Sequence, residues 1–285
     1  MKLATFSAGG LPELGIVKGE EIISISRASP RLALDMIDLI ARWSMLEDDV
    51  RKIEAAKSNA LALESVTLLA PVPKPGKILA IGLNYADHIE ETKQPRPEHQ
   101  IWFSKMPSAV NAPFAPIVIA RDGEAVDYEA ELVAVVGRKA RHVTSTEAPS
   151  VVFGYCCGND VTERAWQFRT SQWVLGKSFD THAPIGPWIT TAAECRDPHA
   201  LAIRCFVNGE RRQNSNTKHL VFNLWDQIAH LSKVLTLEPG DLIFTGTPGG
   251  VGNAMKPPRF LKAGDRVRVE IDGLGAIEAN CARED

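Results

Sequence analysis

From residue 77 onward, short apolar runs alternate with glycine, proline, asparagine and aspartate, and this pattern constrains the fold more than any other feature of the sequence. Runs of this kind, bounded by turn-forming residues, predict strands, and many in succession favour a β-rich barrel or sandwich. The predicted strands cover residues 78–81, 117–119, 132–136, 151–156, 187–190, 201–207, 241–245 and 266–271. Helical stretches at 87–93, 162–172 and 224–235 interrupt them, so we expect an α+β fold rich in strands.

The segment that precedes this pattern marks a domain boundary. Residues 70–76, Ala-Pro-Val-Pro-Lys-Pro-Gly, hold three prolines and a glycine, which favour an extended linker. We therefore expect a small N-terminal α/β domain in residues 1–70 and a larger domain in residues 71–285. In the small domain the predicted strands cover residues 2–7, 14–17 and 21–25. A helix is predicted over residues 32–43, and a second follows residues 47–49 and runs to residue 62.

Composition excludes several classes of protein. The formal net charge of the 285 residues is −3, without the basic excess typical of nucleic-acid-binding proteins. No apolar run approaches the ~20 residues that a membrane-spanning helix needs. The five cysteines include no CxxC pair, which argues against a disulfide framework or a zinc ribbon. We therefore expect a protein of the reducing cytoplasm, with neither nucleic acid nor membrane as a partner.

Two glutamates at alternate positions, Glu129 and Glu131, stand just before a strongly apolar run. In a strand this spacing places both carboxylates on one face, where a cation would relieve their repulsion. A third carboxylate, Asp160, follows the next predicted strand along the chain. Three carboxylates suit Mg²⁺, Mn²⁺ or Ca²⁺ better than zinc. A Glu-x-Glu pair is also typical of a solvated edge strand, and an Asn-Asp pair of a turn, so two interpretations stand at this point.

His88 and Glu91 lie three residues apart in a predicted helix and therefore share one of its faces. A carboxylate beside an imidazole fixes its tautomer and raises its basicity, as a general base that activates water requires. The competing interpretation is a surface helix capped by Asp87, with a solvated histidine.

Other polar residues allow two interpretations each. Lys177 follows a glycine, but its segment lacks the complete spacing of a phosphate-binding loop. Arg164 and Gln167 share a predicted helix face just after Asp160, where surface solvation would also explain them. Residues 244–252 are rich in glycine and follow a predicted strand. Their backbone amides form either an anion-binding nest or only a tight loop.

Six motifs follow one another between about Lys77 and Ala279: Gly82-Leu83-Asn84-Tyr85-Ala86-Asp87-His88, Phe103-Ser104-Lys105-Met106-Pro107, Asp127-Tyr128-Glu129-Ala130-Glu131-Leu132, Gly158-Asn159-Asp160-Val161-Thr162-Glu163-Arg164, Gly176-Lys177-Ser178-Phe179-Asp180 and Phe244-Thr245-Gly246-Thr247-Pro248. Their shared order resembles the fumarylacetoacetate hydrolase family. The resemblance implies a mixed β-roll or barrel as the catalytic domain, behind a small N-terminal domain. It favours the catalytic interpretation of the polar residues over the structural one.

The resemblance also implies a role for each candidate residue. The family holds a divalent cation, here expected to be Mg²⁺ with Mn²⁺ or Ca²⁺ as alternatives, and carries its acid–base pair on a mobile lid helix. Homodimers are common in it, so the expected partners are a small 2-oxo acid and a second copy of this chain. The matching residues are Glu129, Glu131 and Asp160 for the metal, His88, Glu91 and Lys177 for catalysis, and Arg164, Gln167 and Thr247 for substrate binding.

The length of the chain and its first six residues resemble bacterial members that hydrolyse 2,4-diketo-3-deoxy sugar acids, such as the L-rhamnonate or L-fuconate derivatives. We therefore expect metal-dependent hydrolysis of a carbon–carbon bond in a 2,4-dioxo acid, giving pyruvate and a second acid. Oxaloacetate decarboxylation or keto–enol isomerisation on the same site is the nearest alternative. Ureidoglycolate lyase activity and non-catalytic binding of a dicarboxylate are two others. The His88–Glu91 pair favours hydrolysis, because a decarboxylase need not activate water.

Overall fold

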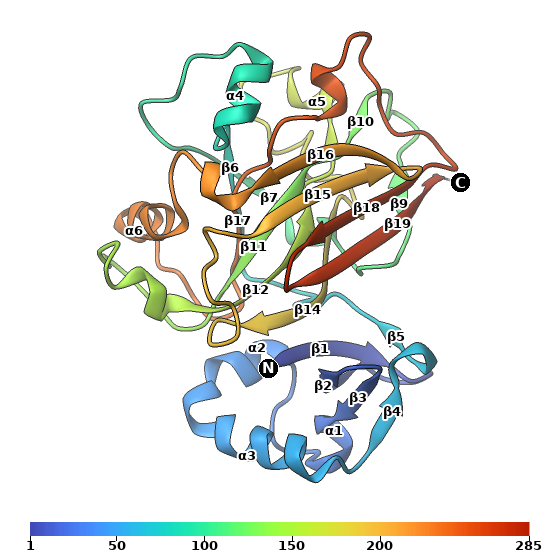
Figure 1. The fold of residues 1–285 in the computed structure, drawn as a ribbon, viewed down its shortest axis with the longest axis vertical. Helices are drawn as coiled ribbons and strands as arrows, with labels where there is room; N and C mark the ends of the chain where they lie inside the picture. The colour runs from blue at the N-terminus through green and yellow to red at the C-terminus, as the bar shows by residue number, and fades with distance from the viewer. Residues whose placement is uncertain (285) are drawn as a thin grey trace.

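The protein was studied as a computed structural model, which describes residues 1–284 (Figure 1). Asp285, the last residue of the predicted larger domain, lies outside the described residues. The fold is α+β and rich in strands, as the sequence predicts. Within residues 1–284, no helix is long and apolar enough to cross a membrane, and all five cysteines are free.

A twelve-stranded sheet runs through the molecule, from the N-terminal strands to the strands beside the candidate site. Its strands are β1 (Lys2–Ser7), β2 (Glu13–Lys18), β3 (Glu21–Ser24), β4 (Ala60–Ala62), β5 (Thr67–Leu68), β6 (Ile78–Gly82), β7 (Ile101–Lys105), β8 (Val110–Asn111), β11 (Ala130–Val136), β12 (Val152–Asn159), β14 (Ala183–Thr191) and β17 (Leu242–Phe244). The main path is β4-β3-β2-β1-β14-β12-β11-β17-β6-β7, with β5 beside β1 and β8 beside β14.

A second sheet of five strands, in the order β16-β15-β18-β19-β9, covers β11 and β12 (Figure 1). Its strands are β9 (Ile117–Ile119), β15 (Ala202–Val207), β16 (Glu210–Asn216), β18 (Arg266–Ile271) and β19 (Gly275–Arg283), and a short pair is formed by β10 (Val126–Asp127) and β13 (Thr162–Glu163). Between the sheets lies an apolar core that includes Leu132, Tyr155, Ile203 and Val269. The sequence analysis predicted neither β16 nor β19.

The helices are short and lie outside the sheets (Figure 1). They are α1 (Ile25–Ala28), α2 (Met36–Ala41), α3 (Trp43–Ala56), α4 (Ala86–Thr92), α5 (Arg164–Gln167) and α6 (Leu224–Val234), with 3₁₀ turns η1 (Leu63–Ser65), η2 (Pro107–Ala109), η3 (Ala148–Val151), η4 (Thr217–His219) and η5 (Gly252–Ala254).

Three predicted helices have different bounds in the structure. The helix predicted over residues 32–43 begins only at Met36, because the Asp38 carboxylate accepts from the backbone N–H of Leu34 and holds a turn there. The helix predicted over residues 162–172 is reduced to α5, because residues 162–163 pair as β13 and Thr170 turns the chain after it. The helix α3 ends at Lys57, in the left-handed conformation with φ 48°, before the predicted residue 62.

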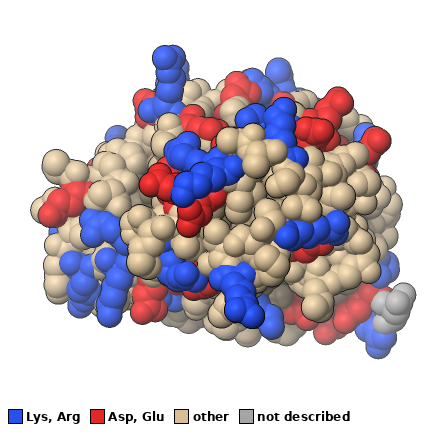
Figure 2. All heavy atoms as spheres, turned by 90° about the horizontal axis from the view of Figure 1, so that it is seen from below, with Lys and Arg blue, Asp and Glu red and all other residues tan. Residues whose placement is uncertain are grey.

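The N-terminal strands are continuous with the rest of the large sheet. Strand β1 pairs antiparallel with β14, with Lys2 opposite Thr190 and Leu3 opposite Ile189. One buried apolar cluster includes Leu3 and Ile16 together with Ile185 and Phe244. Strand pairing and one apolar cluster both extend across the predicted boundary at residue 70. The division into two domains therefore stays a prediction. The face of the molecule seen in Figure 2 carries Lys and Arg interspersed with Asp and Glu.

The order of the central strands determines which loops meet. Strands β17 and β6 run parallel, and β11 runs antiparallel to β17, with Val133 opposite Phe244. The segments that follow β6 and β17 therefore leave the sheet at the end where β11 begins. Strand β12 finishes at the same end of the sheet, because it is antiparallel to β11. Four segments distant in sequence converge there, and they carry the polar residues singled out by the sequence.

Candidate active site

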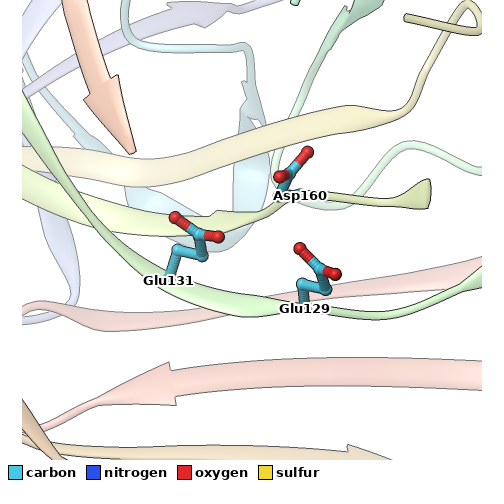
Figure 3. A group of neighbouring side chains, drawn as sticks. All are labelled: Glu129, Glu131 and Asp160. Carbon is cyan, nitrogen blue, oxygen red and sulfur yellow. The ribbon is translucent and has the colours of Figure 1, made fainter. Parts of the chain in front are cut away.

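Glu129, Glu131 and Asp160 converge at this end of the central strands (Figure 3). Glu131 lies in β11 opposite Gly158, and Glu129 precedes the strand, where its carbonyl accepts from the Asp160 N–H at 2.9 Å. One ligand oxygen from each carboxylate lies within 4.8 Å of the others, and all three residues are buried. The alternating positions 129 and 131 thus face the buried interior, and the solvated edge-strand interpretation is wrong.

Two buried lysines hold Asp160 from either side. Lys177 Nζ donates to Asp160 Oδ2 at 2.6 Å and to Glu129 Oε2 at 2.7 Å. Lys105 Nζ, at the end of β7, donates to Asp160 Oδ1 at 2.6 Å and to the Val161 carbonyl at 3.1 Å. Charge-assisted bonds of this length fix both the position and the orientation of the carboxylate.

Arg164 is also held by buried partners. Its Nε and Nη2 atoms donate to Asp127 Oδ2 at 2.9 and 2.8 Å, and its Nη2 lies 2.7 Å from Glu129 Oε1. Its Nη1 donates to Gln167 Oε1 at 2.9 Å. The other Asp127 oxygen accepts from the Gly252 N–H at 2.7 Å, so this pair also holds the loop after β17. Surface solvation therefore does not explain Arg164 or Gln167, both of which are buried.

The electrostatics of the three carboxylates differ. Burial alone would raise the pKa of Glu129, but Lys177 and Arg164 outweigh it and lower the pKa to about 2. For Glu131, burial and the charges of Asp160 and Glu129 raise the pKa well above its usual range. Glu131 receives a backbone hydrogen bond from Gly246 at 2.7 Å, and no lysine or arginine among the described residues forms an ion pair with it. The cluster thus lacks positive charge beside Glu131, and a hard divalent cation fits this set of oxygen ligands.

The helix α4 carries His88 and Glu91 above the carboxylates. His88 is largely buried, and its Nδ1 lies 3.9 Å from Glu91 Oε2, too far for a hydrogen bond. Within residues 1–284, this buried Nδ1 has no hydrogen-bond partner. Glu91 Oε2 instead accepts from the Gly250 N–H at 2.5 Å. Asp87 does not act as the cap, since Tyr85 holds that position.

A cavity of about 570 Å³ joins the two groups. Its walls include eight of the nine residues predicted for the site: His88, Glu91, Glu129, Glu131, Arg164, Gln167, Lys177 and Thr247. Asp160, the ninth, lies directly behind, bonded to Lys177. A larger cavity of about 840 Å³ lies near the N-terminal strands, but its only titratable lining residues are Glu20 and Glu64. The smaller cavity is therefore the candidate active site.

The glycine-rich loop after β17 forms one wall of this cavity. Gln213, fully buried in β16, donates to Thr247 Oγ1 and to the Pro248 carbonyl, each at 2.8 Å, and accepts from the Ala130 N–H at 2.9 Å. It thereby ties the loop to the beginning of β11. Gly250 has φ 102°, and a Cβ there would collide with the Arg212 carbonyl, so this position requires glycine.

The sequence analysis assigned no role to Lys105, Asp127 or Gln213. Two of them lie within motifs that carry the resemblance, so position was a usable signal for Lys105 and Asp127. Gln213 lies in a polar strand, and nothing in its neighbourhood marks it. Only the pairing of β16 brings this side chain to the loop after β17.

Comparison with known proteins identifies the family of the chain. The fumarylacetoacetate (FAA) hydrolase C-terminal family matches residues 77–282. A mitochondrial oxaloacetate tautomerase of Rattus norvegicus is 40% identical over 282 residues, covering 97% of this chain and 90% of the relative. A mitochondrial oxaloacetate tautomerase of Homo sapiens is 41% identical over 283 residues, with the same coverage of 97% and 90%.

Solved structures agree over the whole chain. Maleylpyruvate hydrolase from Sphingobium sp. SYK-6, in complex with manganese(II) ion and pyruvate, has a TM-score of 0.86 and 35% identity, with 100% of both chains covered. Fumarylacetoacetate hydrolase from Exiguobacterium antarcticum has a TM-score of 0.85 and 33% identity, again covering 100% of both chains.

These comparisons correct one expectation and establish another. The expected cytoplasmic location is wrong as a simple assignment, because curated relatives at 40–41% identity are named as mitochondrial proteins. The fold, the buried carboxylates and the matches over nearly the whole sequence agree with one another. The chain belongs to the fumarylacetoacetate hydrolase superfamily of enzymes.

Proposed function

We propose that this enzyme interconverts the keto and enol forms of a small 2-oxo dicarboxylic acid of the oxaloacetate type. The hydrolysis expected from the sequence becomes the second candidate. The similarity to oxaloacetate tautomerases, at 40–41% identity over 97% of the chain, supports this order. Tautomerisation moves one proton between a carbon and an oxygen, and it requires no water held for attack.

The proposed reaction uses a bound divalent cation. Glu129, Glu131 and Asp160 would hold a divalent cation, Mg²⁺ or Mn²⁺, of which the manganese in the similar maleylpyruvate hydrolase gives one precedent. When bound, such a cation supplies Lewis acidity that makes the protons next to a 2-oxo group more acidic. Lys177 and Lys105 keep the Asp160 carboxylate in place, and Arg164 does the same for Glu129.

His88 is the residue we propose to move the proton. The observation that carries the proposal is its buried Nδ1, which has no partner among residues 1–284, in a residue that lines the same cavity as Glu129 and Glu131. A buried nitrogen without a partner is unfavourable, and a bound substrate would supply the missing contact. Glu91 is engaged with Gly250, and the imidazole can act without it, because tautomerisation needs only one group that takes up and returns a proton.

One observation favours hydrolysis as the second candidate. Glu91 Oε2 lies only 3.9 Å from His88 Nδ1, and a small rotation of either side chain would complete a base able to activate water. Water would then attack the carbon 4 carbonyl of a 2,4-dioxo acid, and cleavage between carbons 3 and 4 would give pyruvate and a second acid. The similarity to maleylpyruvate hydrolase points in the same direction.

A direct comparison of substrates tests the proposal. The ultraviolet absorbance of enol-oxaloacetate reports tautomerisation, and coupled detection of pyruvate reports hydrolysis of acylpyruvates, each with Mg²⁺, with Mn²⁺ and with chelator. Metal without protein is the necessary control, because free divalent cations promote enolisation and decarboxylation themselves. A kcat/KM for enol-oxaloacetate below that for every acylpyruvate tested would overturn the proposal in favour of hydrolysis.

A further inference from the structure

We propose that Lys93 and Lys256 form a subsite for the distal carboxylate of a 2-oxo dicarboxylate, at the mouth of the candidate active site. The inference rests on the proposed function and deepens it, because it identifies the residues that would distinguish a dicarboxylate from a monocarboxylate of the same length.

The two lysines reach one cavity from two different segments. Lys93 ends α4, in the left-handed conformation with φ 55°, and Lys256 follows η5 in the loop after β17. Both side chains line the cavity of about 570 Å³ that contains Glu129 and Glu131, and both residues are exposed. The Gly250 N–H donates to Glu91 at 2.5 Å, so the two segments are held beside each other.

Within residues 1–284, these lysines differ from the other cations of the cavity because no side chain or carbonyl pairs with their ammonium groups. Arg164 is committed to Asp127 and Glu129, and Lys177 to Glu129 and Asp160. No ion pair or hydrogen bond involves Nζ of Lys93 or of Lys256 in the part of the chain that the structure describes, residues 1–284. They are thus the two cationic groups of the cavity wall whose charge is available to a ligand.

The charge of the whole site favours a ligand with two negative charges. The charged side chains that line the cavity, their ion-pair partners Asp127 and Asp160, and Lys105, which pairs with Asp160 in turn, make five cations and five carboxylates: Lys93, Lys105, Arg164, Lys177 and Lys256 against Glu91, Asp127, Glu129, Glu131 and Asp160. A divalent cation would leave this set with two positive charges. A dicarboxylate balances them, whereas a monocarboxylate leaves one at the mouth of the cavity, where Lys93 and Lys256 lie.

Two ligands of equal length provide the test. 2-Oxoglutarate and 2-oxopentanoate share the 2-oxo acid group and five carbons, and only the first has a distal carboxylate. Calorimetric titration of the Mn²⁺-loaded enzyme measures their affinities without any turnover. The variants are Lys93→Gln, Lys256→Gln and the double substitution. The control is Lys139→Gln, an exposed lysine beyond the opposite end of β11, which is seven residues or roughly 20 Å long.

We expect the wild type and Lys139→Gln to bind 2-oxoglutarate more tightly than 2-oxopentanoate. In the double variant 2-oxoglutarate affinity should fall roughly 5- to 20-fold, the range for two partly exposed ion contacts, while 2-oxopentanoate affinity stays unchanged. A wild type without preference for the dicarboxylate, or an equal loss for both ligands, overturns the subsite. If the wild type prefers 2-oxoglutarate to 2-oxopentanoate but does not tautomerise oxaloacetate, the proposed function is rejected and the subsite is kept.

Discussion

The candidate active site has a floor, formed by Glu129, Glu131 and Asp160, and a lid, the helix α4, and the two are held in place in different ways. On the floor, Glu131 and Asp160 owe their positions to the register of β11 against β12, and buried lysines neutralise Asp160 from both sides. The lid, α4, has seven residues and rests on the loop after β17 through side-chain hydrogen bonds to backbone N–H groups. Strand pairing cannot change without unfolding, whereas bonds of the second kind break and re-form easily.

The difference suggests a division of labour. The floor is suited to holding a cation in fixed geometry, because its ligands have little freedom. The lid is suited to delivering His88 to a substrate, because few contacts hold it: Asp87 accepts from Ser215 Oγ at 2.5 Å and from the Gly249 N–H at 3.3 Å, and Glu91 accepts from Gly250. Variants in each region should therefore fail in different ways.

The largest effect is expected on the floor. Asp160→Asn preserves shape but removes the charge between Lys105 and Lys177, so Mn²⁺ binding and all metal-dependent turnover should be lost. Calorimetry with Mn²⁺ measures the first and the enol-oxaloacetate assay the second. Asp180→Asn, at an exposed aspartate, serves as the control. Wild-type Mn²⁺ affinity in Asp160→Asn would remove Asp160 from the metal site.

On the lid, His88→Asn should separate catalysis from metal binding. We expect kcat to fall roughly 10²–10⁴-fold, the usual range for loss of a general acid–base group, with Mn²⁺ affinity unchanged. His142→Asn is a matched control, because His142 is exposed and asparagine tolerates its φ of 54°. If Mn²⁺ affinity falls together with kcat, the proposed separation between floor and lid is wrong.

A third substitution measures how firmly the floor is held. Lys105→Met leaves Asp160 with a single cationic partner in a buried position, which should cost about 3–5 kcal/mol of unfolding free energy. Urea unfolding in chelator measures this cost without any contribution from metal. Combining Lys105→Met with Asp160→Asn should cost less than the sum of the two single changes. Strict additivity would mean that the two side chains do not stabilise each other.

The smallest effect concerns His182, a second buried imidazole, near Lys105. Burial, followed by the charge of Lys105, lowers its pKa from 6.5 to about 3. Below pH 6.5 His182 is protonated in the unfolded chain but stays neutral in the folded protein. The free energy of unfolding therefore falls by about 1.4 kcal/mol per pH unit as the pH falls towards 3. His182→Leu should lack this slope when urea unfolding is followed from pH 7 to 5. Parallel pH profiles for variant and wild type would contradict the assignment.

The sequence predicted the floor better than the details around it. The spacing of Glu129 and Glu131 before an apolar run is a local signal, and β11 bears it out, with every residue from Ala130 to Val136 buried. Strand β16, at the edge of its sheet, has the sequence Glu-Arg-Arg-Gln-Asn-Ser-Asn and shows no apolar alternation. Its pairing with β15 is what makes it a strand, and local sequence does not encode that.

The same limit applies to the ion partners. Lys105 ends β7, which ranges from exposed to buried along its length, and an exposed lysine would have been an equally reasonable expectation from that segment alone. Lys105 and Asp160 are 55 residues apart, and β7 lies four strands from β12 in the large sheet, so their contact depends on how the sheet curves in three dimensions. The length of α5 was overestimated for a similar reason, because β13 takes the residues before it into pairing with β10.

The pairing of β1 with β14 has a practical consequence for truncated forms of this enzyme. Removing the first 70 residues would uncover β14 at Ile189 and Thr190, the two residues that β1 pairs with in this nine-residue strand; β8 pairs with it only at Ala183 and Pro184. Unpaired N–H and C=O groups along such an edge recruit strands from other molecules, which leads to aggregation. A shortened protein that contains every proposed catalytic side chain is therefore expected to precipitate. In the full chain, the N-terminal strands cover β14 and prevent this aggregation.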